Sequence, residues 1–226
     1  AEVMTHCGPD GAVFDLQHGL WNRERLESGV ALVSSRTIPL VRTLSARPED
    51  IAVGLEAGAA GVIVPMVETA ETARAAIAAT RYPPHGIRSA GGVRPLMDFA
   101  AHFEAERKDP PVVGVMIETA AGMEAAKEIA AVDGVDFVFV GTGDLAVSLG
   151  LFPKIDERHA EAVGRILSDA RSEGCAAGAF SIDERVGAKW RGLGAQFTVL
   201  ACDSEVLRAR TADELAAFRT ANPPAQ

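Results

Sequence analysis

Two acidic side chains stand where buried strands are expected to end. Glu118 comes directly after the apolar run Val112–Ile117. Asp144 follows the apolar run Phe137–Val140 across a short turn. The interval, 144 − 118 = 26 residues, fits one strand–helix–strand unit. Because parallel strands end on the same side of a sheet, the sequence predicts that Glu118 and Asp144 together bind one divalent cation.

Each carboxylate also has a structural interpretation. Glu118 could form a salt bridge at the mouth of a barrel, although a carboxylate directly after an apolar strand needs a strong partner. Asp144 could be the N-cap of a helix over Leu145–Leu149, which is a common role for Asp. The joint placement of the two residues favours metal binding.

Three further residues near strand ends suggest acid–base chemistry. Asp15 could orient one ring nitrogen of His18 so that the other accepts a proton, or His18 could be a structural loop residue. Arg42 ends the run Ile38–Val41 and could stabilise an oxyanion. It could also form a purely structural ion pair with Glu118. Asp15, His18 and Arg42 are therefore candidate catalytic residues.

Other motifs narrow the chemistry. No lysine ends an apolar strand, which disfavours a Schiff-base aldolase. No GxxxxGK[ST] or GxGxxG pattern is present, which disfavours a nucleotide site. Arg88 and Arg94 flank the turn Gly91-Gly92 and could bind a distal carboxylate of a substrate or fix the loop.

Short apolar runs alternate with helical segments along the chain. Runs without polar alternation are typical of parallel strands that helices cover on both faces. The sequence therefore predicts an α/β fold, a (β/α)8 TIM barrel whose first strand is missing from this chain, with an open doubly wound sheet as the alternative. The predicted strands are Ala12–Leu16, Ile38–Arg42, Gly61–Pro65, Val112–Ile117, Phe137–Val140, Ala176–Phe180 and Gln196–Leu200.

The chain is expected to form one domain over residues 1–226. Helices are predicted to begin at Pro48 and Glu68, and another to span Ile155–Glu173. The stretch Arg81–Pro95, rich in Pro and Gly, is predicted to be a loop over the strand ends. Residues 221–226 are expected to fray.

Composition limits the class of protein. The chain has 226 residues, of which 48% are hydrophobic and 23% charged, so it can bury a large core. A net charge of −9 with dispersed arginines argues against nucleic acid. Apolar runs far shorter than the roughly 20 residues that a membrane span needs argue against a membrane protein. Three cysteines without CxxC spacing suggest reduced thiols, and the expected location is the cytoplasm.

Several segments, taken in order along nearly the whole chain, resemble the HpcH/HpaI aldolase family, which includes 4-hydroxy-2-oxoheptane-1,7-dioate aldolases. The resemblance implies a (β/α)8 barrel and a class II pyruvate aldolase that requires a divalent metal, Mg, Mn or Co. It rests on the segments Phe14–Gly19, Pro39–Arg42, Gly58–Val67, Arg81–Arg88, Met116–Thr119 and Val140–Leu145.

The resemblance also implies roles for individual residues. Glu118 and Asp144 would be the metal ligands, and Arg42 would stabilise the enolate oxygen. His18, paired with Asp15, would act as the acid–base dyad through a metal-bound water. Substrate binding falls to Arg42 and to the turn residues Thr142, Gly143 and Asp144. In that turn, the N–H groups of Gly143 and Asp144 would receive the pyruvate carboxylate.

The implied reaction is the reversible cleavage of a 4-hydroxy-2-oxo acid to pyruvate and an aldehyde through a metal-stabilised enolate. Two alternatives stay open: a CoA-thioester lyase of the citrate lyase β-subunit type, and a non-catalytic barrel subunit. Family members are typically hexamers, arranged as trimers of dimers. A helix over Asp203–Phe218 is the candidate for packing on a neighbouring subunit.

Overall fold

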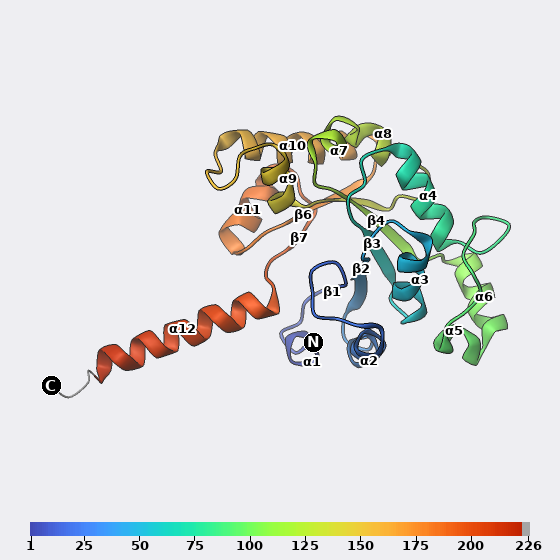
Figure 1. Cartoon of the computed structure of the whole chain (residues 1–226), viewed down its shortest axis with the longest axis horizontal. Helices are drawn as coiled ribbons and strands as arrows, with labels where there is room; N and C mark the ends of the chain where they lie inside the picture. The colour runs from blue at the N-terminus through green and yellow to red at the C-terminus, as the bar shows by residue number, and fades with distance from the viewer. Residues whose placement is uncertain (223–226) are drawn as a thin grey trace.

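The computed structural model describes residues 1–222, which contain a seven-stranded parallel sheet. The strands follow one another in chain order, and each pair of neighbouring strands is joined by a crossover that contains one or more helices. The sheet curls as part of a barrel (Figure 1). The strands are β1 Gly11–Asp15, β2 Ile38–Arg42, β3 Gly61–Val64, β4 Val112–Ile117, β5 Phe137–Val140, β6 Ala176–Phe180 and β7 Phe197–Val199.

Helices connect these strands and cover the outer face of the sheet (Figure 1). The helices of the described residues, with α1 before the first strand and α12 after the last, are α1 Glu2–Thr5, α2 Arg23–Val33, α3 Pro48–Glu56, α4 Ala70–Thr80, α5 Val93–Met97, α6 Phe99–Lys108, α7 Ala120–Glu124, α8 Ala126–Ala130, α9 Thr142–Ser148, α10 Glu157–Ser172, α11 Glu184–Gly192 and α12 Asp203–Ala221.

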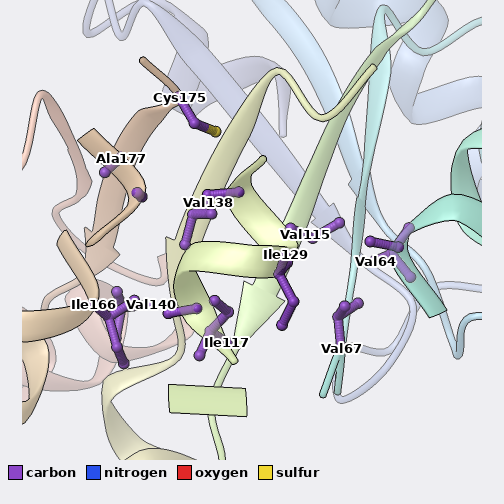
Figure 2. Packing of buried hydrophobic residues seen from close by; sticks show 14 of the residues in the cluster. Val64, Val67, Val115, Ile117, Ile129, Val138, Val140, Ile166, Cys175 and Ala177 are labelled. Atoms are coloured by element: carbon purple, nitrogen blue, oxygen red, sulfur yellow. The ribbon is translucent and has the colours of Figure 1, made fainter. Parts of the chain in front are cut away.

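The main hydrophobic core lies between the outer face of the sheet and the helices. Alternate residues of β4, such as Val115 and Ile117, point outward into this core. Ile129 of α8 and Ile166 of α10 pack in the same core, as Figure 2 shows. A separate cluster on β1 and β2 packs Phe14 against α2.

The other residue set of each strand faces the inside of the curled sheet. Ile63, Met116 and Phe139 form a third cluster there, with Leu40 packed against it. Side chains alternate along a strand, so Arg42 lies on the same face as Leu40, and Glu118 continues the row of Met116. The alternation therefore turns the predicted functional side chains toward the inside of the sheet.

The predicted strands are confirmed, with ends that differ by one residue in β1, β3 and β7. In the described residues, β1 pairs only with β2 and β7 only with β6, so the structure shows a seven-stranded partial barrel and not a complete (β/α)8 barrel. The expected fraying falls partly on residues 223–226, which lie outside the described residues, and α12 remains helical through Ala221.

The predicted loop Arg81–Pro95 is wrong at its end, because helix α5 already begins at Val93. The segment lies between α4 and α5, within the connection that leads to the amino end of β4. Arg88 is buried there against Glu106, and Arg94 donates to the carbonyl of Glu27. Both arginines therefore pair within the protein.

Helix α12 projects away from the rest of the molecule (Figure 1). None of its residues is buried, and Leu207 and Phe218 are 70% and 67% exposed. Within residues 1–222, no helix combines the length and apolar character that crossing a membrane requires.

Candidate active site

The carboxyl ends of the strands bring together residues that are far apart in the sequence. Asp15 and Arg42 end neighbouring strands and are directly opposite each other in the β1–β2 register. Glu118 follows β4, and Asp144 lies in the first turn of α9, after β5. The charges of Asp144, Arg42 and His18 all act on Glu118, so these groups share one region of the molecule.

Asp15 and Arg42 form a two-pronged ion pair. Arg42 Nε donates to Asp15 Oδ1 at 2.7 Å, and Arg42 Nη2 donates to Asp15 Oδ2 at 2.6 Å. Such fork-to-fork pairing fixes the plane of the guanidinium as well as its position. The alternative of a structural ion pair between Arg42 and Glu118 is wrong, because the guanidinium pairs with Asp15 instead.

His18 meets Asp15 through its backbone and not through its ring. Asp15 Oδ1 accepts hydrogen bonds from the backbone N–H groups of Gln17 at 3.0 Å and His18 at 3.2 Å. No hydrogen bond joins the His18 ring to Asp15 in the described part of the chain, so the predicted orientation of the ring by this carboxylate is not seen. The side chain of Asp15 instead shapes the loop that carries His18.

Asp15 is held in its ionised form. Burial alone would raise the pKa of this carboxyl, but the hydrogen bonds and charge of Arg42 and the amides of His18 and Gln17 outweigh it, and the pKa of Asp15 is lowered. A carboxylate that stays charged keeps its grip on the guanidinium. The Asp15–Arg42 pair therefore stays charged at neutral pH.

Glu118 is 1% exposed and only half satisfied. Its Oε1 accepts a hydrogen bond from the backbone N–H of Met66 at 2.7 Å, whereas Oε2 is buried without any hydrogen-bond partner. Met66 has φ of 57°, a conformation that residues other than Gly, Asn and Asp seldom adopt. That strained backbone aims the N–H of Met66 at the carboxylate.

Gly141 provides the space that Glu118 occupies. A Cβ on Gly141 would lie 2.4 Å from Glu118 Oε2 and 2.8 Å from Glu118 Cβ. Any side chain at position 141 would therefore displace the carboxylate. Gly141 is also the N-cap of α9, and it supplies no side chain to cap that helix.

Burial raises the pKa of Glu118, and the nearby charge of Asp144 raises it further. The N–H of Met66 and the charges of Arg42 and His18 oppose the change without cancelling it. A cation bound at Oε2 would lower the pKa of Glu118 again and so restore the ionised carboxylate.

Asp144 and its neighbours lie at the start of α9. Asp144 and Gly143 are exposed, whereas Thr142 is buried. The N-cap is Gly141, so the interpretation of Asp144 as an N-cap is wrong. Ser148, at the other end of α9, accepts a hydrogen bond from the N–H of Ala120 at 2.9 Å. This contact ties α9 to the segment that follows Glu118.

The residues present fit a divalent cation. The unpartnered, buried Oε2 of Glu118 is a strong acceptor without a donor, and the charge of Asp144 acts on it. No cluster of three or more His, Cys, Asp or Glu suited to a metal occurs among residues 1–222. A site with two carboxylates is typical of Mg²⁺, which is usually bound by one or two carboxylates and by oxygens of substrate and water.

The sequence did not indicate a role in the site for two residues, Met66 and His159. Met66 carries no sequence signal for a left-handed backbone, because that conformation is usually recognised from Gly or Asn. His159 lies on the buried face of α10, where its ring meets the start of α9. An ionisable residue among the apolar positions of an amphipathic helix was the available signal.

Comparisons with known proteins identify the family of this chain. A family model described as HpcH/HpaI aldolase/citrate lyase matches residues 1–209. This chain belongs to that family. A hydroxypyruvate/pyruvate aldolase from Roseovarius nubinhibens is 35% identical over 97% of this chain and 87% of its own length. A 4-hydroxy-2-oxo-heptane-1,7-dioate aldolase from Salmonella dublin is 33% identical over 96% of this chain and 84% of its own.

Two solved structures share the fold of this chain. A crystal structure of a family protein from Burkholderia cenocepacia superposes with a TM-score of 0.90, at 28% identity over 96% of this chain and 89% of its own. The CitE protein of Mycobacterium tuberculosis, in complex with magnesium, acetoacetate and coenzyme A, gives a TM-score of 0.62 at 20% identity, over 99% of this chain and 84% of its own, and shows the fold alone. Family relatives named aldolases support a lyase activity on small molecules.

Proposed function

We propose that this HpcH/HpaI protein is a class II aldolase that reversibly cleaves a 4-hydroxy-2-oxo acid to pyruvate and an aldehyde. The observation that carries the proposal is the buried Glu118, whose Oε2 lacks a partner. A buried carboxylate oxygen without a donor is costly unless a cation or a proton satisfies it. The names of the relatives support the substrate class.

Glu118 and Asp144 would hold the divalent cation. When bound, the ion would supply Lewis-acid stabilisation of the negative charge that develops on the oxo group of the substrate. Carboxylate oxygens are the ligands that a hard cation of this kind prefers. We propose Mg, Mn or Co.

Arg42 would bind the oxygen that becomes the enolate oxygen. Its side chain is only 18% exposed and is fixed by two hydrogen bonds to Asp15, so it needs little reorganisation as charge develops. The backbone N–H groups of Gly143 and Asp144 would receive the carboxylate of the oxo acid, beside Thr142. Together these groups would orient C2 and C3 of the substrate.

His18 would accept the proton of the 4-hydroxyl group. Its loop is held by the hydrogen bonds to Asp15, while the His18 side chain lies in an exposed position that a substrate can reach. Removal of that proton forms the aldehyde carbonyl as the C3–C4 bond breaks, and the electron pair of that bond passes into the enolate of pyruvate. A proton returned to C3 completes the release of pyruvate.

The test is the release of pyruvate from a panel of 4-hydroxy-2-oxo acids by protein treated with a chelator and then resupplied with Mg²⁺, Mn²⁺ or Co²⁺. We expect cleavage only with metal. Pyruvate and hydroxypyruvate should be compared as donors in the reverse direction, because the relative from Roseovarius nubinhibens is named for both. Full activity in the chelated protein would refute the proposal.

A CoA-thioester lyase is the second candidate, favoured by the citrate lyase half of the family description. It predicts that cleavage depends on a CoA ester, so the same panel with and without CoA thioesters separates the two activities. A non-catalytic barrel subunit would bind neither Mn²⁺ nor pyruvate.

We further propose a homo-oligomer, a hexamer built as a trimer of dimers, in the cytoplasm. The exposed apolar residues of α12, which stand off the body of the molecule, support assembly through this helix. Light scattering of the purified chain measures its oligomeric state.

A further inference from the structure

His159 is buried on the face of α10 that packs on the sheet, where it is 5% exposed. A polar ring in such a position is costly unless it is hydrogen-bonded. Its Nε2 lies 2.7 Å from the backbone carbonyl oxygen of Thr142. A carbonyl oxygen can only accept, so Nε2 must carry the hydrogen.

The contact belongs to a closed network. Thr142 Oγ1 donates to the carbonyl of Phe180 at 3.1 Å, and Trp190 Nε1 donates to that same carbonyl at 3.0 Å. The rings of Trp190 and His159 meet edge to face, with centroids 5.8 Å apart. Thr142 is thereby held at two points, through its carbonyl by α10 and through its hydroxyl by the end of β6.

This network replaces a cap that the site cannot have. Gly141 must lack a side chain because Glu118 occupies the adjoining space, so α9 begins without a capping side chain. The helix is only seven residues long and gains little stability of its own. Its first turn, which contains Asp144, is therefore fixed by tertiary contacts at Thr142.

We propose that His159 is a positioning residue of the active site, which fixes the first turn of α9 and with it the carboxylate of Asp144 and the N–H groups that receive the oxo acid. The inference rests on the proposed function for its consequence in binding. The effect on the backbone of α9 can be measured without that function.

The main test compares His159→Leu, which removes the donor, with His159→Gln, whose amide N–H₂ can reach the carbonyl of Thr142. Loss of one buried hydrogen bond should raise the Kd for Mn²⁺, and for pyruvate in the presence of Mn²⁺, by about tenfold or more in His159→Leu. His159→Gln should restore both to within about threefold of the original chain. His102→Leu is the matched control, because His102 belongs to the remote contact with Tyr82 and should leave both Kd values unchanged.

Hydrogen exchange of the metal-free protein provides the second measurement. The backbone amides of residues 142–149 should exchange about tenfold faster in His159→Leu than in the original chain, and those of α6 should not change. If His159→Leu does not fold, His159→Phe, which keeps an aromatic ring and loses the donor to the carbonyl of Thr142, takes its place with the same expectation.

The outcomes are distinguishable. Faster exchange at α9 in a protein that binds neither Mn²⁺ nor pyruvate would refute the proposed function and keep the positioning role. Unchanged exchange and unchanged Kd values in a folded His159→Leu variant would overturn the inference. Equal losses in His159→Leu and His159→Gln would also overturn it, because shape and not the donor would then be responsible.

Discussion

The side chain of Arg42 grips Asp15 with two of its nitrogens, at 2.6 and 2.7 Å, where two neighbouring strands end. The pair is formed by opposite residues of the β1–β2 register, so backbone hydrogen bonds hold the two side chains side by side. A fork of this kind has one geometry, which a flexible ammonium group cannot reproduce. The pair therefore fixes the orientation of the Arg42 guanidinium, which the proposed reaction would use to stabilise negative charge.

Replacement of the Arg42 guanidinium by an ammonium group, which cannot form the two-pronged pair with Asp15, should impair catalysis. We expect Arg42→Lys to lower kcat for pyruvate release by about 10²–10³-fold, the range seen when one oxyanion donor is lost. Steady-state kinetics with the best substrate of the panel measures the effect. Arg47→Lys, in an exposed guanidinium at the start of α3, is the control and should change kcat less than about twofold. An unchanged kcat in Arg42→Lys would remove Arg42 from the reaction.

Glu118→Gln keeps the shape of the side chain and removes the charge. We expect the Kd for Mn²⁺ to rise by about 100-fold or more, because a hard cation loses one of two carboxylate ligands. Isothermal titration calorimetry with Mn²⁺ measures the Kd. Glu124→Gln, in an exposed residue of α7 paired with Arg165, should bind Mn²⁺ as the original chain does. Equal affinity in Glu118→Gln would contradict the assignment of the ligand.

The pKa values of Glu118 and Asp15 predict opposite effects of pH on the metal-free protein. The pKa of Glu118 is raised, so its contribution to stability is fully present below the ordinary carboxylate pKa and is lost as pH rises through the raised value. The pKa of Asp15 is lowered, so its contribution is present above the ordinary pKa and is lost as pH falls through the lowered value.

Thermal unfolding with a chelator, from about pH 3 to pH 8, tests both signs. Relative to the original chain, Glu118→Gln should gain stability as the pH rises. As the pH rises through the acidic range, Asp15→Asn should instead lose stability relative to the original chain, because Asp15 becomes ionised in the original chain. A constant difference across the whole range would show that neither carboxyl has the shifted pKa.

The space beside Glu118 leads to a prediction about backbone chemistry. Gly141→Ala would bring a Cβ to 2.4 Å from Glu118 Oε2, so the carboxylate or α9 must move. We expect a loss of about 1–3 kcal/mol of folding stability and of most Mn²⁺ affinity. Gly164→Ala, in α10, has its nearest neighbour at 3.7 Å and should be neutral or slightly stabilising. Denaturant unfolding and Mn²⁺ titration decide between these outcomes.

Helix α12 gives a prediction about assembly. Leu207, Leu215 and Phe218 recur at intervals that place them on one side of the helix, and all are exposed. We expect Leu207→Glu combined with Phe218→Glu to lower the molar mass measured by light scattering. Ala216→Glu, on the opposite side of the same helix, should leave it unchanged. A monomeric original chain would contradict the proposed oligomer.

The sequence was sufficient to predict the strands, because short uninterrupted apolar runs such as Val112–Ile117 are typical of parallel strands that are buried on both faces. It also indicated which polar residues follow those runs. The identity of their partners was beyond its reach. Arg42 was given Glu118 as a possible partner, whereas register places Asp15 directly opposite Arg42. Register depends on pairing between segments far apart in the chain.

The backbone details of the site were also inaccessible. The φ of 57° at Met66 accompanies the hydrogen bond from its N–H to Glu118 and opposes the preference of Met. The bond from His159 to Thr142 joins two helices whose relative placement depends on the whole sheet. The sequence also left open which end of the strands the loop over 81–92 covers, since a Gly- and Pro-rich composition carries no information on this point.

The two outer strands of the sheet have a consequence for the environment of the site. In the described residues, β1 and β7 each pair on one side only, so each presents a row of backbone N–H and C=O groups toward the gap between them. Such an edge accepts an extended peptide as an additional strand. A strand placed in this gap would exclude water beside Asp15 and lower the local dielectric constant. The strength of the attraction between Asp15 and Arg42 thus depends on what occupies the space between β1 and β7.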